Sequence, residues 1–143
     1  MHERDASTPI PTILLAEENQ SLRRWLGVLL SEAGYRVIRA GTGPDVLRLL
    51  RGRTPIDLLI TNSRVGKVPG WEIAQYTSKL RPSVRMVRLI ESQADAVPIY
   101  GADPATIVLL QKPFTITELV DVVRTLLARG SDLSIAHRVL RHA

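Results

Sequence analysis

The chain contains no cysteine among its 143 residues. Disulfide bonds and thiolate metal sites are therefore excluded, and a reducing compartment such as the cytoplasm is the predicted location. Histidine offers no metal site either. Of the three histidines, His137 and His142 are five positions apart and His2 is remote, which is not the spacing of a zinc site.

Aromatic residues and long apolar runs are also scarce. Phe, Trp and Tyr make up 4% of the chain, so platforms for stacking nucleic-acid bases are few. No stretch approaches the roughly 20 apolar residues of a membrane span. The 19 Lys and Arg against 14 Asp and Glu give a net charge of +5, and the basic residues are dispersed, which is typical of a solvated surface. We expect no membrane insertion and rank nucleic-acid binding last.

The remaining composition is that of one folded domain. Hydrophobic residues make up 45% and charged residues 23%, which is enough apolar surface for a core at this length. Residues 1–10 lack an apolar run and are predicted to form a flexible polar leader, not a signal peptide. The domain is expected over residues 11–129. Residues 130–143 form a C-terminal extension, in which a short helix over 132–141 is expected to pack on the domain or to contact a partner.

Short apolar runs alternate with longer stretches of helical periodicity. The run TILLA is too short for a helix and is typical of a strand buried on both faces. Strands are expected at residues 12–16, 35–39, 56–61, 84–90 and 106–110, and helices at 22–30, 44–50, 71–80 and 115–128. Residues 91–103 should contain the fourth helix, but Pro98, Gly101 and Pro104 weaken it, so a short or mobile segment is predicted there.

This alternation predicts an α/β fold with a doubly wound, five-stranded parallel sheet and helices on both faces. Ligands of such sheets bind beyond the carboxyl ends of the strands. Polar residues follow several of those ends: Glu17 and Glu18, Asn62, Glu91, and Lys112. We expect the chemistry of the protein, if it has any, at this edge.

Motifs at the strand ends carry a more specific signal. They are ILLAEEN over residues 13–19, SEAGYRVIRAGTG over 31–43, DLLITN over 57–62 with Gly70-Trp71-Glu72 beyond it, and LQKPF over 110–114. In this order and spacing the sequence resembles the receiver domain of bacterial two-component response regulators, over roughly residues 11–129. The resemblance implies a CheY-like, flavodoxin-like sheet with strand order 2-1-3-4-5.

The resemblance also implies roles for some of these residues. In the family, two acidic residues and an aspartate hold Mg²⁺, and a lysine pairs with the oxygens of the transferred phosphoryl group. Glu17 and Glu18 match the acidic pair, and Lys112 matches the lysine. Pro113 matches a proline that commonly follows a cis peptide bond in this family.

Other positions depart from the family pattern. Asn62 stands where the phosphoacceptor aspartate is expected, Ile90 where a Ser or Thr hydroxyl is expected, and Leu109 where an aromatic residue is expected. Val65 and Gly66 replace the usual Met-Pro of the loop. A carboxamide is a poor nucleophile and does not form a stable acyl phosphate, so the family's phosphorylation switch should not operate here.

These matches and departures lead to a functional hypothesis. The chain is interpreted as a non-enzymatic receiver module of phosphorelay signalling that acts by protein contact, independently of aspartate phosphorylation. The expected partner is a histidine kinase, a phosphotransfer protein, another regulator or a second copy of the chain. The contact is expected on the face formed by the fourth and fifth helices. The alternative is phosphorylation of another residue, such as Ser63.

The acidic pair and the strand arginines leave further alternatives open. No cofactor is expected, although Glu17 and Glu18 could retain a weak Mg²⁺ site; an ion pair with Lys112 or Arg64 is favoured instead. Asn62 is expected to cap local backbone groups.

Two arginines interrupt the fourth strand. Arg85 is expected at the strand's entrance. Arg88 is expected to reach solvent or to pair with a carboxylate such as Glu91, with an arginine-lined anion pocket as the alternative.

Overall fold

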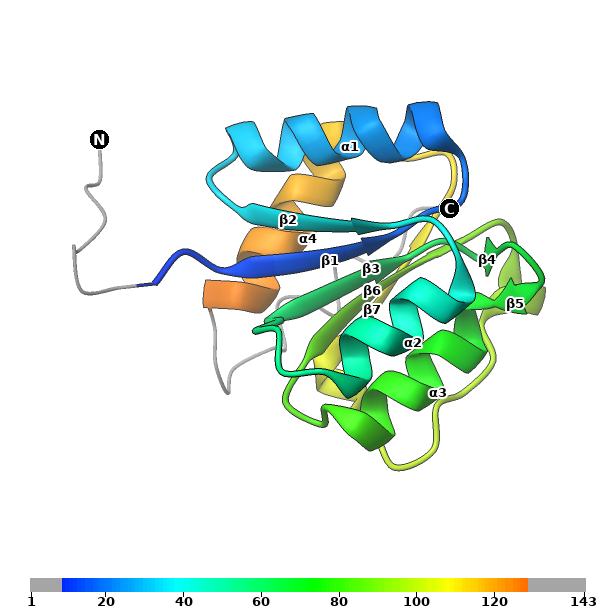
Figure 1. Cartoon of the computed structure of the whole chain (residues 1–143). Helices are drawn as coiled ribbons and strands as arrows, with labels where there is room; N and C mark the ends of the chain where they lie inside the picture. Colours follow the sequence, from blue (N-terminus) through cyan, green and yellow to red (C-terminus); the bar gives the residue numbers. More distant parts are fainter. Residues whose placement is uncertain (1–8, 129–143) are drawn as a thin grey trace.

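The computed structural model describes residues 9–128 as a central parallel sheet with helices on both faces (Figure 1). The sheet contains β1 (Thr12–Ala16), β2 (Arg36–Ala40), β3 (Leu58–Thr61), β6 (Arg85–Ile90) and β7 (Ile107–Gln111). The helices are α1 (Gln20–Glu32), α2 (Gly43–Arg51), α3 (Gly70–Leu80) and α4 (Ile116–Ala128). Within the described range no helix has the length and apolar character needed to cross a membrane. The predicted terminal helix, and the predicted leader apart from residues 9 and 10, lie outside the described residues.

The order of strands in the sheet is β2-β1-β3-β6-β7, and all four neighbouring pairs are parallel. Counted along the chain among the strands of this sheet, the order is 2-1-3-4-5. The doubly wound, flavodoxin-like fold predicted from the sequence is therefore confirmed. Its consequence is that β1, β3, β6 and β7 all end at the same edge.

Each face of the sheet carries its own apolar layer. Successive residues of a strand point to opposite faces, and all five residues of β1 are buried. Ile13 and Leu15 pack in the cluster that includes residues of α1 and α4. Leu14 and Ala16 pack in the cluster that includes residues of α2 and α3 (Figure 1). Burial on both faces explains the uninterrupted apolar run in this strand.

No strand was predicted between β3 and α3, but this segment contains a small hairpin. It consists of β4 (Arg64–Val65) and β5 (Val68–Pro69), which pair antiparallel. Gly66 in its turn has a φ of +64°, a conformation that favours glycine. Strands of two residues have no periodicity to detect, which is why sequence patterning missed them.

Residues 91–106, which connect β6 to β7, are called the 91–106 segment. The α-helix expected in this segment is absent. Two short 3₁₀ turns stand in its place, η1 (Gln93–Asp95) and η2 (Pro104–Thr106). A proline cannot donate the backbone hydrogen bond that a helix interior requires, so Pro98 and Pro104 favour this outcome. The expected weakening of this helix is confirmed, and a contact face with an α-helix between β6 and β7 is not available in this structure.

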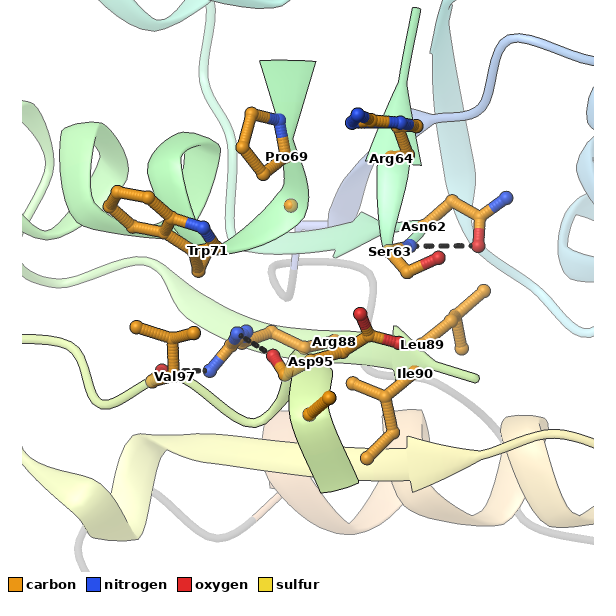
Figure 2. Close-up of a pocket in the computed structure, with 12 residues that line it drawn as sticks. Asn62, Ser63, Arg64, Pro69, Trp71, Arg88, Leu89, Ile90, Asp95 and Val97 are labelled. Atoms are coloured by element: carbon orange, nitrogen blue, oxygen red, sulfur yellow. Dashed lines mark hydrogen bonds between the residues drawn. The ribbon is translucent and has the colours of Figure 1, made fainter. Parts of the chain in front are cut away.

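Arg88 holds the first half of the 91–106 segment against the sheet. Its side chain is only 4% exposed, and its Nη1 and Nη2 donate to the backbone oxygens of Val97 and Asp95, both at 2.7 Å (Figure 2). The expected pairing with Glu91 is therefore wrong: Arg88 binds backbone carbonyls instead. Burial lowers the pKa of the Arg88 guanidinium, and the nearby Asp95 carboxylate opposes that shift.

Candidate functional site

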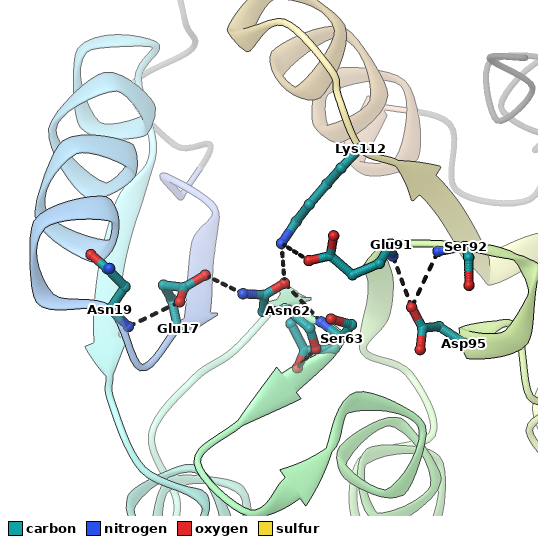
Figure 3. Close-up of polar contacts among 9 residues, drawn as sticks. Glu17, Asn19, Asn62, Ser63, Glu91, Ser92, Asp95 and Lys112 are labelled. Carbon is teal, nitrogen blue, oxygen red and sulfur yellow. Dashed lines mark hydrogen bonds and ion pairs between the residues drawn. The ribbon is translucent and has the colours of Figure 1, made fainter.

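Polar side chains from four strand ends meet at one edge of the sheet (Figure 3). Glu17 follows β1, Asn62 follows β3, Glu91 follows β6 and Lys112 follows β7. The strands are parallel neighbours, so their carboxyl ends bring together residues up to 95 positions apart in the chain. The structure thus gathers four of the residues singled out in the sequence as following the strand ends.

Asn62 is the centre of this polar network. Its Nδ2 donates to Oε1 of Glu17 at 2.7 Å, and its Oδ1 accepts from Nζ of Lys112 at 2.6 Å. The same Oδ1 accepts from the backbone N–H of Ser63 at 2.8 Å, which is the local cap expected from the sequence. A carboxamide offers both a donor and an acceptor, so it fits between a carboxylate and an ammonium group. A carboxylate at this position would have no hydrogen to give to Glu17.

The acidic pair is engaged by backbone groups. Glu17 is 2% exposed, and its Oε2 accepts from the N–H of Asn19, the residue that caps α1, at 2.9 Å. Glu18 accepts from the N–H of Gly66 in the hairpin turn at 3.1 Å. These two contacts tie the start of α1 and the hairpin to the end of β1.

The ion pair expected between the acidic pair and Lys112 or Arg64 is not formed. Lys112 pairs with Glu91 instead, at 2.9 Å between Nζ and Oε2. Asn62 lies between Glu17 and Lys112 and bonds both, which keeps the two charged groups apart. Because Glu91 is 61% exposed, the pair is screened by solvent and contributes about 1 kcal/mol or less to stability.

The donor atoms at this edge do not fit a resident Mg²⁺. Both oxygens of Glu17 accept hydrogen bonds, Glu18 binds Gly66, and Asn62 turns its amide hydrogens toward Glu17. Residues 9–128 contain no group of three or more His, Asp or Glu side chains that could hold a metal ion. Mg²⁺ prefers near-octahedral oxygen ligands, and in this arrangement both Glu17 oxygens are already committed to Asn19 and Asn62.

The remaining predicted site positions lie around this network. Ile90 ends β6 with its side chain 3% exposed, and its backbone oxygen accepts from the N–H of Lys112 at 2.9 Å. Leu109 is half-buried in β7 opposite Arg88. The Lys112–Pro113 peptide bond is cis, as the resemblance implies. None of these side chains places a hydroxyl or an aromatic ring beside Asn62.

Sequence reasoning missed the structural role of Asp95. Its Oδ2 accepts from the N–H groups of Glu91 and Ser92, at 2.8 and 3.3 Å, and so fixes the backbone that carries Glu91 (Figure 3). Ser92 and Asp95 form a capping box around η1. The signal was present in the sequence as Ser-x-x-Asp, a spacing typical of such caps.

A doubly wound sheet with an acidic pair and a lysine at its carboxyl edge is the arrangement expected of the receiver-domain class. The sequence confirms this class, because the profile of the response regulator receiver domain family matches residues 13–124. The chain belongs to that family, whose members are signalling modules.

Individual relatives agree with this assignment. The chain is 29% identical over 115 residues to the response regulator receiver protein CpdR of Brucella abortus, covering 80% of this chain and 95% of CpdR. It is 27% identical over 132 residues to the transcriptional regulatory protein PdtaR of Mycobacterium tuberculosis, covering 91% of this chain and 63% of PdtaR. The crystal structure of a response regulator receiver protein from Sinorhizobium medicae is similar with a TM-score of 0.72 and 26% identity, over 85% of this chain and 98% of that one.

Proposed function

We propose that this chain is a receiver module of two-component signalling that works by protein contact and does not use aspartate phosphorylation. The observation that carries the proposal is the position of the Asn62 carboxamide between Glu17 and Lys112. In relatives the residue at this strand end is a phosphoacceptor aspartate, as the resemblance of DLLITN to the family motif implies. Here the position holds a neutral amide.

The amide changes the chemistry of the site in two ways. Its nitrogen lone pair is delocalised into the carbonyl group, so it does not attack a phosphoryl donor as a carboxylate does. Its oxygen also occupies Lys112, the cation that would otherwise pair with the phosphoryl oxygens. Hydrogen bonds among Glu17, Asn62, Lys112 and nearby backbone groups therefore support a fixed arrangement of these side chains.

Signalling modules of this family work with kinases, phosphotransfer proteins or other regulators. The expected contact face included an α-helix between β6 and β7, which this structure lacks. We therefore assign the contact surface to α4, β7 and the 91–106 segment. Tyr100 is 80% exposed on this segment. Its backbone is held by Gln75 of α3, whose side chain donates to the Tyr100 oxygen at 2.8 Å and accepts from the Tyr100 N–H at 3.0 Å. A presented, anchored aromatic residue is typical of a contact point between proteins. The identity of the partner, a second copy of the chain included, and the cytoplasmic location stay predictions.

Incubation with acetyl phosphate and Mg²⁺, followed by intact-mass spectrometry, tests the proposal. We expect no labile adduct of about 80 Da, the mass of one phosphoryl group, under conditions that label an aspartate-bearing receiver domain run in parallel. An adduct mapped to Ser63 would establish the alternative acceptor. An adduct on any other residue of the strand-end site would also overturn phosphorylation independence.

A further inference from the structure

A cavity of about 320 Å³ lies beside Asn62, between the β4–β5 hairpin and the first half of the 91–106 segment (Figure 2). Asn62, Ser63, Arg64 and Trp71 contribute to one wall. Arg88 and Val97 contribute to the other. The volume is at the lower end of the range for small-molecule sites in proteins.

The charged groups in the walls favour an anion. Arg64 is exposed at the hairpin, and no carboxylate among residues 9–128 forms an ion pair with it. Arg88 also lines the cavity, but its Nη1 and Nη2 donate to the backbone oxygens of Val97 and Asp95, so Arg64 is the guanidinium that faces an incoming anion. The one acidic residue of the lining, Asp95, directs its Oδ2 to the backbone of Glu91 and Ser92. Planar guanidinium groups bind carboxylates through paired hydrogen bonds.

The apolar groups of the lining favour a flat ring. Trp71 opens α3, and its side chain is 38% exposed on the cavity side of the hairpin (Figure 2). Pro69, Ile90 and Val97 supply aliphatic surface around it. An indole face with a nearby cation suits an aromatic ring that carries a negative group. Phe, Trp and Tyr make up only 4% of the chain, so a half-exposed tryptophan in a cavity wall is a specific feature.

From this geometry we propose that the cavity binds a small planar aromatic carboxylate, with its ring against Trp71 and its carboxylate at Arg64. This inference deepens the proposed function, because Asn62 and Ser63 form part of the same wall. A bound ligand would contact Asn62, which accepts a hydrogen bond from Lys112, and the 91–106 segment, which carries Glu91. The site would thus take a chemical signal at the edge where relatives take a phosphoryl group.

Titration with 1-naphthoate, followed by ¹H–¹⁵N NMR of the full chain, tests this site. The chain has two tryptophans, and the Trp25→Phe variant assigns their indole N–H signals. We expect a saturable shift of the Trp71 signal and no saturable shift of the Trp25 signal. Trp25 is the internal control, because it is 53% exposed on α1, the helix that carries Arg23 and Arg24. Equal shifts of both signals, or no saturable shift of Trp71, would overturn the proposal.

Two comparisons test the charge and the location. The uncharged analogue 1-naphthamide should bind at least about tenfold more weakly, because it loses the paired contacts to guanidinium.

Arg64→Gln should weaken 1-naphthoate binding about fivefold or more. Arg48→Gln, which removes the same charge from an exposed position on α2, should leave it unchanged. Equal binding of naphthoate and naphthamide, or equal loss in the two variants, would contradict the assignment. Neither readout involves phosphorylation, so this inference and the proposed function can fail separately.

Discussion

Replacing Asn62 by aspartate is expected to destabilise the protein in Mg²⁺-free buffer and to make its stability depend on Mg²⁺. The variant carboxylate would face Oε1 of Glu17, which now accepts a hydrogen bond of 2.7 Å from Nδ2. Two acceptors of like charge at this distance repel, and the donor to the buried Glu17 is lost. We expect a loss of about 1–3 kcal/mol in the free energy of unfolding.

Mg²⁺ should reverse this loss because the variant then has three carboxylates at the strand ends, and ligands that bind the folded state stabilise it. Urea unfolding with and without Mg²⁺ measures both effects. Ser31→Asp is the control, since it adds the same negative charge at an exposed position near the end of α1, which begins beside the strand-end site and runs away from it. An Asn62→Asp variant that matches the wild type in both buffers would show that the amide is not needed between Glu17 and Lys112.

Replacing Arg88 by methionine is expected to loosen the 91–106 segment and to lower the free energy of unfolding by about 1–3 kcal/mol. Methionine keeps most of the apolar stem but removes the donors to Val97 and Asp95, each at 2.7 Å. The partly buried carbonyl groups would then lack their charged partner. The loss of a buried charge offsets part of the cost, because its removal from water is itself unfavourable.

Chemical denaturation and amide hydrogen exchange measure the two consequences of the Arg88 substitution. Faster exchange should be concentrated in residues 91–97, with smaller changes in α1 and β1. Arg48→Met is the control. The side chains of Arg48 and Asp45 are 71% and 51% exposed, so their ion pair contributes about 1 kcal/mol or less to stability. If the two variants lost the same stability, or if exchange rose equally in every element, Arg88 would not have the local role described above.

The main sheet was predictable because its strands are buried on both faces. Runs such as Ile13–Leu15 in β1 and Leu58–Ile60 in β3 are apolar throughout, and strand–helix alternation then requires parallel neighbours. Boundaries were less accurate. Tyr35 was predicted in β2, but its N–H donates to the oxygen of Leu30 at the end of α1, so the strand begins one residue later. Such a contact depends on where the helix ends, which periodicity does not specify.

The site was predictable only as a set of residues. The carboxyl ends of parallel strands meet at one edge, so Glu17, Asn62 and Lys112 could be placed together from the sequence. Their partners could not. Lys112 pairs with Glu91 because Asn62 already lies between it and Glu17, and that arrangement is set by distances across four strands. The role of Arg88 likewise depends on the path of the 91–106 segment.

The most direct test of the central claim reads the Asn62 side chain itself. Beryllofluoride binds carboxylates as a mimic of a phosphoryl group, and it can be titrated with Mg²⁺ into ¹⁵N-labelled protein. We predict that the Asn62 side-chain NH₂ signals of the wild type stay unchanged at concentrations that saturate the Asn62→Asp variant, as judged from the backbone signals of residues 62–64 and 112. A saturable shift of the wild-type Asn62 signals in the same range would contradict the account, because it would mean that an amide at this position still supports a phosphoryl-like ligand.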